Sequence, residues 1–284
     1  MTDYGRPIRF GYFLTPVADP VRPVELAQLA DQVGLDCVGV QDHPYQRRFH
    51  DTWTLMTAIA MKTERISVFP DVANLPLRPP GMLAKAAASL DLLSGGRFEL
   101  GLGAGGFWDA IAAMGGSRRT PGESIRALGE AIEVIRMLWS DAPLARFKGE
   151  FYQLAGVKPG PQPAHPIGIW LGVYKPRGLA LVGRSGDGWV PSLGYFKVED
   201  LAAGSTLIDE AARAAGRDPA AIQRVLNVPP GISPQVLAGL ALEHGMDTFV
   251  FSEGEEPETQ LRYLAADVIP RTVELVAAGR AASG

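Results

Sequence analysis

Residues 71–106 read DVANLPLRPPGMLAKAAASLDLLSGGRFELGLGAGG, and this stretch decides the fold. It contains an apolar helical pattern over residues 79–93, then a strand-like run over residues 97–102 that ends in a glycine-rich turn. The same succession of a short apolar strand and an amphipathic helix continues on both sides. We therefore expect a chain built from repeated strand-and-helix units.

The whole chain contains eight such strands. They are expected at residues 8–14, 37–40, 66–69, 97–102, 167–171, 188–191, 222–228 and 247–251. The clearest helices are expected at residues 21–33, 51–63, 79–93, 121–138 and 258–278. Strands that alternate with helices pair in parallel through right-handed crossovers, so eight units predict an α/β fold of the closed (β/α)8 TIM barrel type. A doubly wound open sheet of six strands is the alternative.

One segment interrupts the alternation. Residues 140–166 are rich in Pro and Gly and are too long for an ordinary loop between a helix and a strand. We expect a small hairpin there, inserted between the fourth helix and the fifth strand and marking no domain boundary. Residues 1–284 are accordingly predicted to form a single domain.

Composition excludes several classes of protein. Among 284 residues, 27 Lys and Arg stand against 31 Asp and Glu, so the basic field that a nucleic acid requires is absent. The single cysteine, Cys37, has no partner for an internal disulfide and is expected as a buried small hydrophobe. The first residues, MTDYGRPIRFGYF, lack the apolar stretch of a signal peptide or membrane anchor. We expect a cytoplasmic protein with no nucleic-acid partner, no membrane partner and no metal site.

The second strand ends in Asp42 and His43, at the place where a parallel barrel carries its active site. A histidine titrates near neutral pH, and a neighbouring carboxylate favours its protonated form, so the pair suits proton transfer. His43 is therefore the predicted catalytic residue. The alternative is a surface histidine that caps the following loop.

A glycine-rich turn follows the fourth strand and consists of Gly103, Ala104, Gly105 and Gly106. Glycine lets a backbone approach a ligand closely, because it has no side chain and tolerates positive φ. A dinucleotide fingerprint would place the glycines after the first strand, so we reject a Rossmann NAD site. The turn is predicted to bind another cofactor, with an active-site loop that binds none as the alternative.

A third signal follows the fifth strand. It consists of Gly172, Val173, Tyr174, Lys175, Pro176, Arg177 and Gly178. Two cations stand here at the start of a helix, whose free N–H groups and dipole attract anions. A cation at the start of a helix is repelled by the positive end of the helix dipole unless an anion is bound there. The two cations therefore predict a phosphate site. The alternative is that both side chains are simply solvated. The rigid apolar segment 75–80 would suit the wall of a flat ring.

Taken together, these motifs resemble the luciferase-like monooxygenase superfamily of flavin- and deazaflavin-dependent oxidoreductases. The resemblance extends over nearly the whole chain. Its carriers are RFGYF (residues 9–13), GVQDHP (39–44), the quoted stretch 71–106, and GVYKPRGLALVGRSGDGW (172–189).

The resemblance implies a barrel with an insertion, a flavin-type ring over the strand ends, and a phosphate held by residues 172–178. It also implies a non-prolyl cis peptide behind the ring, at Asp71–Val72 or else at Pro70–Asp71. Further cofactor contacts implied in this way are Asp42, Asp71, Val72, Ala73, Asn74 and Asp109.

The Asp42–His43 pair is similar to that of the deazaflavin branch, in which the histidine serves proton transfer. This favours the deazaflavin coenzyme F-420 (F420) over FMN. Members that oxidise sugar phosphates have a glutamate where this chain has Gly106, so oxidation of glucose 6-phosphate is not expected.

The leading hypothesis is an oxidoreductase that transfers a hydride between coenzyme F-420 and an unknown small organic substrate. An FMN-dependent monooxygenase supplied by a partner flavin reductase is one alternative. A non-catalytic flavin- or deazaflavin-binding protein is another. The resemblance further implies a homodimer.

Overall fold

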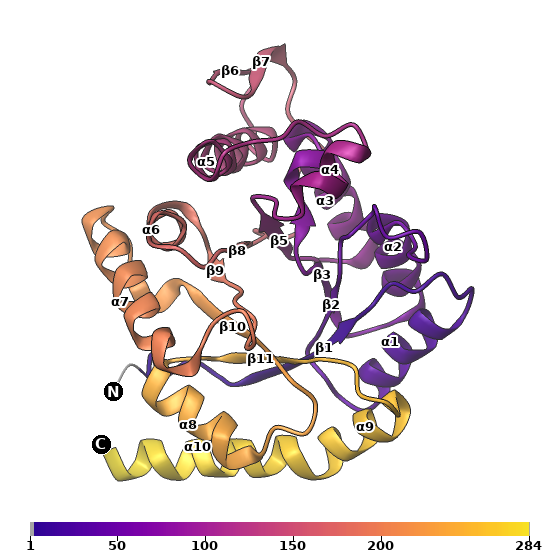
Figure 1. The fold of residues 1–284 in the computed structure, drawn as a ribbon, viewed down its shortest axis with the longest axis vertical. Coiled ribbons are helices and arrows are strands. Elements are labelled where there is room, and N and C mark those ends of the chain that lie inside the picture. Colours follow the sequence, from indigo (N-terminus) through magenta and orange to yellow (C-terminus); the bar gives the residue numbers. More distant parts are fainter. Residues whose placement is uncertain (1–2, 284) are drawn as a thin grey trace.

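Short strands alternate with helices throughout the computed structural model, which describes residues 3–283 (Figure 1). The strands of the main sheet are β1 (Arg9–Leu14), β2 (Cys37–Val40), β3 (Ser67–Pro70), β4 (Ala73–Asn74), β5 (Leu100–Gly103), β8 (Ile169–Gly172), β9 (Gly188–Trp189), β10 (Gln223–Val228) and β11 (Thr248–Phe251). The helices are α1 (Arg22–Gln32), α2 (Thr52–Lys62), α3 (Pro80–Ser94), α4 (Trp108–Ala113), α5 (Pro121–Leu138), α6 (Pro176–Ser185), α7 (Val198–Ala214), α8 (Pro234–His244), α9 (Pro257–Tyr263) and α10 (Ile269–Ser283).

The strands curl into a nearly closed barrel. Their hydrogen-bonded order is β3-β2-β1-β11-β10-β9-β8-β5-β4, and neighbouring strands pair in parallel. β3 and β4 follow each other along the same side of the barrel. The backbone of Val68 in β3 forms hydrogen bonds of 2.9 and 3.1 Å with Arg97 and Glu99, in the segment that leads into β5, and these bonds help to close the barrel. The predicted (β/α)8 TIM barrel is confirmed, and the open six-stranded sheet is wrong.

Sequence periodicity predicts most elements to within a few residues, and the differences have local causes. α5 has the predicted bounds because Thr120 and Glu123 form a capping box at its start. β4 and α4, of 2 and 6 residues, are too short for their periodicity to be detected. The predicted last helix contains a π-helical turn over Leu264–Val268, between α9 and α10.

The insertion lies between α5 and β8 and forms an antiparallel hairpin of β6 (Ala145–Lys148) and β7 (Gln153–Val157), as predicted. It projects beyond α5 on the outside of the molecule (Figure 1). Glu130 of α5 anchors it, because its carboxylate accepts hydrogen bonds from the backbone N–H groups of residues 150–152 at 2.6 to 3.1 Å. The barrel strands are therefore undisturbed by the inserted segment.

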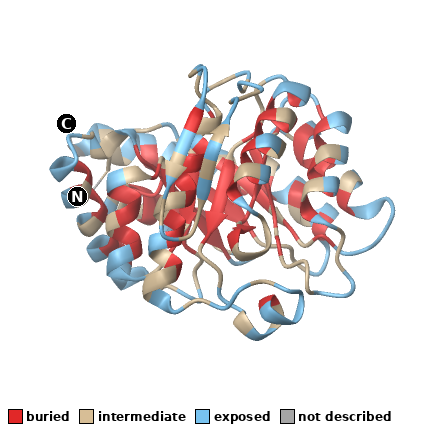
Figure 2. Cartoon of the chain, turned by 90° about the horizontal axis from the view of Figure 1, so that it is seen from above, coloured by how far each residue is buried: buried red, intermediate tan, exposed pale blue. Residues whose placement is uncertain are grey.

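The strands of the barrel consist largely of buried residues, coloured red in Figure 2. The inner cluster consists of Cys37, Phe69, Trp170, Val190, Val225 and Val250. Burial raises the pKa of the Cys37 thiol to about 12, in keeping with its predicted role as a buried hydrophobe. The barrel is a packed core and not a pore, so space for a ligand lies at its mouth. Within residues 3–283, none of the helices combines the length and apolar character needed to cross a bilayer.

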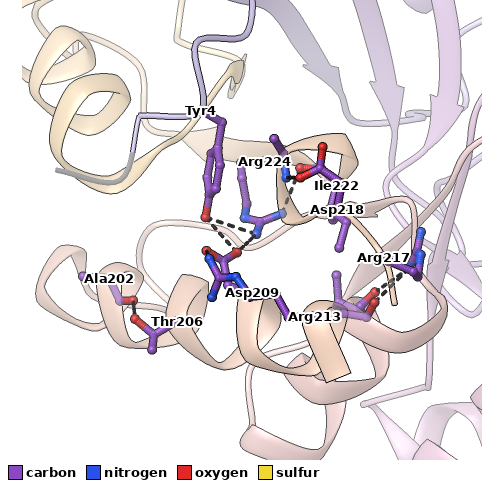
Figure 3. Close-up of polar contacts among 12 residues, drawn as sticks. Tyr4, Ala202, Thr206, Asp209, Arg213, Arg217, Asp218, Ile222 and Arg224 are labelled. Atoms are coloured by element: carbon purple, nitrogen blue, oxygen red, sulfur yellow. Dashed lines mark hydrogen bonds and ion pairs between the residues drawn. The ribbon is translucent and has the colours of Figure 1, made fainter. Parts of the chain in front are cut away.

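A buried arginine joins three distant segments near the start of β10. The side chain of Arg224 is fully buried and donates hydrogen bonds to Asp209 at 2.8 Å and to the hydroxyl of Tyr4 at 3.3 Å (Figure 3). The Tyr4 hydroxyl also donates to Asp209 at 2.9 Å. The N-terminal segment, α7 and β10 are therefore held together by one cation and one carboxylate away from water.

Removing the carboxylate should cost far more than removing an exposed partner. In Asp209→Ala the Arg224 charge stays buried without its anion, and we expect the free energy of unfolding to fall by about 3–5 kcal/mol in urea titrations. Arg213 also pairs with Asp209, at 3.5 Å, but its side chain is 65% exposed. The matched control Arg213→Ala should change stability by less than about 1 kcal/mol. Equal losses in the two variants would contradict this account.

Candidate functional site

The carboxyl ends of the strands bring the predicted site residues together at one mouth of the barrel. A cavity of about 260 Å³ opens there, lined by His43, Asp71, Val72 and Asn227 among others. A second cavity, of about 630 Å³, shares the lining residues Gly172 and Tyr174 with the first and extends over the start of α6. The two cavities together offer room for a ligand with a ring at one end and a longer tail.

A backbone bulge separates β3 from β4 at this mouth. The peptide bond between Asp71 and Val72 is cis, as the resemblance implied. Glycines of β5 and β8 give the bulge its room: a Cβ atom added at Gly103 would lie 2.7 Å from Cγ2 of Val72, and one at Gly172 would lie 2.9 Å from it. Larger residues at these two positions would displace Val72 from the mouth.

His43 lies in the smaller cavity among aromatic rings. Its ring stacks on Tyr45 at 5.3 Å between centroids and meets the edge of Phe107 at 5.2 Å. The Gln41 amide nitrogen lies 3.1 Å from Nδ1 and can only donate, so Nδ1 accepts and the neutral ring carries its proton on Nε2. Burial lowers the pKa of His43 by more than the Asp42 charge raises it. The carboxylate next to it in sequence therefore does not set its protonation state.

Asp42 is 1% exposed, and its carboxylate is occupied by protein groups. It accepts two hydrogen bonds from Arg78, at 2.7 and 2.8 Å, and one from the backbone N–H of Asn74, at 2.8 Å. Arg78 also contacts Asp51 at 2.7 Å. Asp42 thus fixes the loop after β4 against the end of β2, and its predicted contact with a cofactor stays a prediction.

Two helices begin at the larger cavity. α6 starts at Pro176 behind Lys175, and α5 starts at Pro121 behind Thr120. Both starts line the cavity, with the exposed cation Arg177 beside them. Two helix dipoles and two nearby cations make this the most favourable place at the mouth for a phosphate.

The remaining predicted residues differ in their surroundings, and two of them, Ala73 and Asn74, are buried. Ala104 and Gly105 line the larger cavity, and Ala73 and Asn74 form the short strand beside them. A Cβ atom at Gly106 would meet nothing within 4 Å, so this position faces open space. Asp109 is exposed and forms an ion pair with Arg118, and its predicted contact with a cofactor stays a prediction.

Polar residues of later strands also reach the mouth, and the sequence patterns did not predict them. Asn227 of β10 lines the smaller cavity together with Ser192 and Tyr195 of the loop after β9. The oxygen atoms Oδ1 of Asn227, Oδ1 of Asn74 and Oδ2 of Asp71 are buried without a hydrogen-bond partner. Such atoms are costly unless a ligand or water satisfies them. The position of Asn227 between Leu226 and Val228, at the carboxyl end of the strand, was the signal available in the sequence.

The family model described as luciferase-like monooxygenase matches residues 8–236. The chain belongs to this family. The predicted resemblance is thereby confirmed over most of the chain, and the match covers strands β1 to β10, while β11 lies outside it.

Relatives and solved structures agree with this membership. The chain is 35% identical over 177 residues to an F420-dependent glucose-6-phosphate dehydrogenase of Amycolatopsis mediterranei, which covers 60% of this chain and 53% of that one. It is 31% identical over 240 residues to the enzyme of the same name from Kineococcus radiotolerans, covering 79% and 68%. The matched part is therefore only about half to two thirds of each relative.

Two solved structures share the fold. An F420-dependent secondary alcohol dehydrogenase in complex with an F420-acetone adduct superposes with a TM-score of 0.83 at 20% identity, covering 94% of this chain and 99% of that one. The coenzyme F420 dependent tetrahydromethanopterin reductase from Methanopyrus kandleri gives 0.79 at 18%, covering 94% and 100%.

The environment of His43 predicts its titration. Because burial lowers its pKa, the imidazole should titrate below 6.5 and be neutral at pH 7, as NMR of ring protons would show, with His43→Gln assigning the signal. Below 6.5 the unfolded chain binds the proton more readily, so stability should fall as the pH falls. Asp42→Asn should lower the midpoint further, because the Asp42 charge raises the pKa. A midpoint above 6.5 would show instead that the Asp42 charge outweighs burial.

Proposed function

We propose that the protein is an oxidoreductase that transfers a hydride between coenzyme F-420 and a small organic substrate. The observation that carries the proposal is the mouth itself, where His43 shares one cavity with the Asp71–Val72 bulge and with buried oxygen atoms that have no partner. The names of the relatives, which are F420-dependent enzymes, support the choice of coenzyme.

The residues present fit such a coenzyme. The bulge at Val72, with Ala73 and Asn74, would hold one side of the ring, and residues 103–105 would approach it through backbone and small side chains. Lys175, Arg177 and the N–H groups at the start of α6 would hold the phosphate. When bound, the coenzyme supplies the carbon that gives or takes the hydride, and the protein supplies position and electrostatics.

His43 manages the proton that accompanies the hydride. Its Nε2 carries a proton while Gln41 occupies Nδ1, so it presents a donor to a substrate oxygen. Because the lowered pKa keeps the ring neutral near pH 7, the Nε2–H group would bond to the oxygen of a carbonyl substrate and stabilise the negative charge that develops there during reduction. Phe107 and Tyr195 line the cavity and would add apolar surface beside that substrate, and Tyr45 packs against both His43 and Phe107.

Gly106 argues against a sugar phosphate as the substrate. It leaves open space at the rim, with no carboxylate of the kind that the resemblance assigns to sugar-phosphate enzymes.

We also propose a homodimer, for which α3 offers the exposed apolar side chains Met82, Leu92 and Leu93. Sedimentation of a monomer at micromolar concentration would refute the dimer.

Titration with the two coenzymes tests the proposal directly. Trp108 lines the larger cavity, so binding of F-420 should quench tryptophan fluorescence, whereas FMN should bind at least tenfold more weakly. Equal or tighter binding of FMN would favour a flavin monooxygenase. Tight binding of F-420 without hydride exchange across a panel of alcohols, carbonyls and enones would indicate a non-catalytic binding protein.

Replacing His43 should separate binding from turnover. In His43→Ala the F-420 dissociation constant should change little, while turnover of whichever panel substrate the wild type accepts should fall about a hundred- to ten-thousandfold. His50→Ala is the matched control, because His50 bonds to the backbone oxygen of Asp19 at 2.9 Å, outside the cavity lining. The control should retain wild-type turnover. Unchanged turnover in His43→Ala would remove this residue from the mechanism.

A further inference from the structure

Asp71 lies at the floor of the smaller cavity and is the least satisfied carboxyl group of the mouth. It is 8% exposed, and its Oδ2 is buried without a hydrogen-bond partner. Gly39 of β2 leaves room for it, since an added Cβ there would lie 3.0 Å from Oδ2. One oxygen of this buried carboxyl group at the barrel mouth therefore takes part in no hydrogen bond within the protein.

The surroundings of Asp71 are polar but carry no compensating charge. Asn227 is the side chain that bonds to it, and the amide of Asn227 in turn donates to Ser192 at 3.1 Å. Within residues 3–283 no Lys, Arg or His forms an ion pair with Asp71. Asp42 at the same mouth is the contrast, because it is equally buried but fully paired with Arg78.

Burial without a counter-ion disfavours the carboxylate. It raises the pKa of Asp71 to about 7, against the smaller lowering effect of the bond to Asn227. A protonated carboxyl group differs from the carboxylate in one respect that matters at a binding site, since it carries an O–H donor. A buried acid kept neutral in this way can donate a hydrogen bond to a ligand.

We propose that Asp71 acts as a neutral carboxylic acid that donates a hydrogen bond to an acceptor oxygen or nitrogen of the ligand bound in this cavity. The proposal deepens the proposed function and rests on it. The acceptor is either on the coenzyme ring or on the substrate, and in both cases it is a carbonyl oxygen or a ring nitrogen. His43 would then be one of two proton-bearing groups at the mouth.

The other titratable groups around Asp71 are separable from it. His43 faces the same cavity from the end of β2, but its pKa is lowered below 6.5. Tyr174 faces it from the loop after β8, and burial raises the pKa of its phenol above the ordinary value. Cys37 lies behind it in β2, with a pKa of about 12. Between pH 6.5 and 9, Asp71 is the group of this set that changes charge.

The test compares the dissociation constant of F-420, measured by fluorescence quenching from pH 6 to 9, in the wild type and in Asp71→Asn. The amide keeps the size and a donor and does not titrate. The wild-type constant should rise, relative to the variant's, by up to about tenfold for each pH unit above the pKa of Asp71 in the ligand-free protein, and it should level off above the higher pKa of Asp71 in the complex. Since both proteins meet the same coenzyme, its own titration cancels.

Glu99→Gln is the matched control. Glu99 is also largely buried with a raised pKa, but it precedes β5 at the other end of the barrel. This variant should keep the wild-type pH profile. If the pH effect is absent with coenzyme alone and appears when cyclohexenone binds to the coenzyme complex, the acceptor is on the substrate.

A measurement without any ligand completes the test. The infrared spectrum of the wild type at pH 6, minus that of Asp71→Asn, should show the carbonyl band of a protonated carboxyl group, and the band should be lost by pH 9. Absence of the band at pH 6 would overturn the proposal, as would identical pH profiles for the two proteins with both ligands. Failure of the wild type to bind F-420 at any pH would overturn the proposed function and the donor role with it.

Discussion

The mouth of this barrel depends on one close approach of backbone to backbone. The chain between β3 and β4 swings inward at Pro70–Val72, and it can do so because β5 and β8 present glycine there. A Cβ atom added at Gly101 would lie 2.0 Å from the carbonyl oxygen of Pro70, which is closer than any real contact. Every other feature of the site is arranged around this bulge, from the position of Val72 to the burial of the Asp71 side chain.

Buried charged groups are paired at both ends of the barrel, with the exception of Asp71 at the mouth. Near the start of β10, Arg224 and Asp209 neutralise each other and hold distant segments together. At the mouth, Asp42 is neutralised by Arg78, which leaves the loop after β4 fixed, but Asp71 has no cation. A fold that pairs its structural charges so consistently makes an unpaired carboxyl group at the cavity floor informative.

Features of the fold and site that arise from neighbouring residues could be predicted from the sequence, and features that arise from contacts between distant residues could not. The alternation of strands and helices, the inserted hairpin and the strand-end motifs are local patterns, and the barrel rule converts them into one mouth. Asn227 and Ser192 could not be assigned in this way, because a polar residue in or after an apolar strand does not reveal which side chains it will face. The protonation of His43 was equally beyond a local pattern, since Asp42 is its neighbour in sequence while burial among Tyr45 and Phe107 has the larger effect.

The open position at Gly106 has an evolutionary consequence. Its φ angle is not among the positive values that only glycine tolerates well, and a side chain there would meet no atom within 4 Å. A single codon change could therefore add an acid, a base or an apolar group to the rim without disturbing the barrel. The chemistry of the rim could therefore vary at this residue while the barrel and the bulge at Val72 stay unchanged.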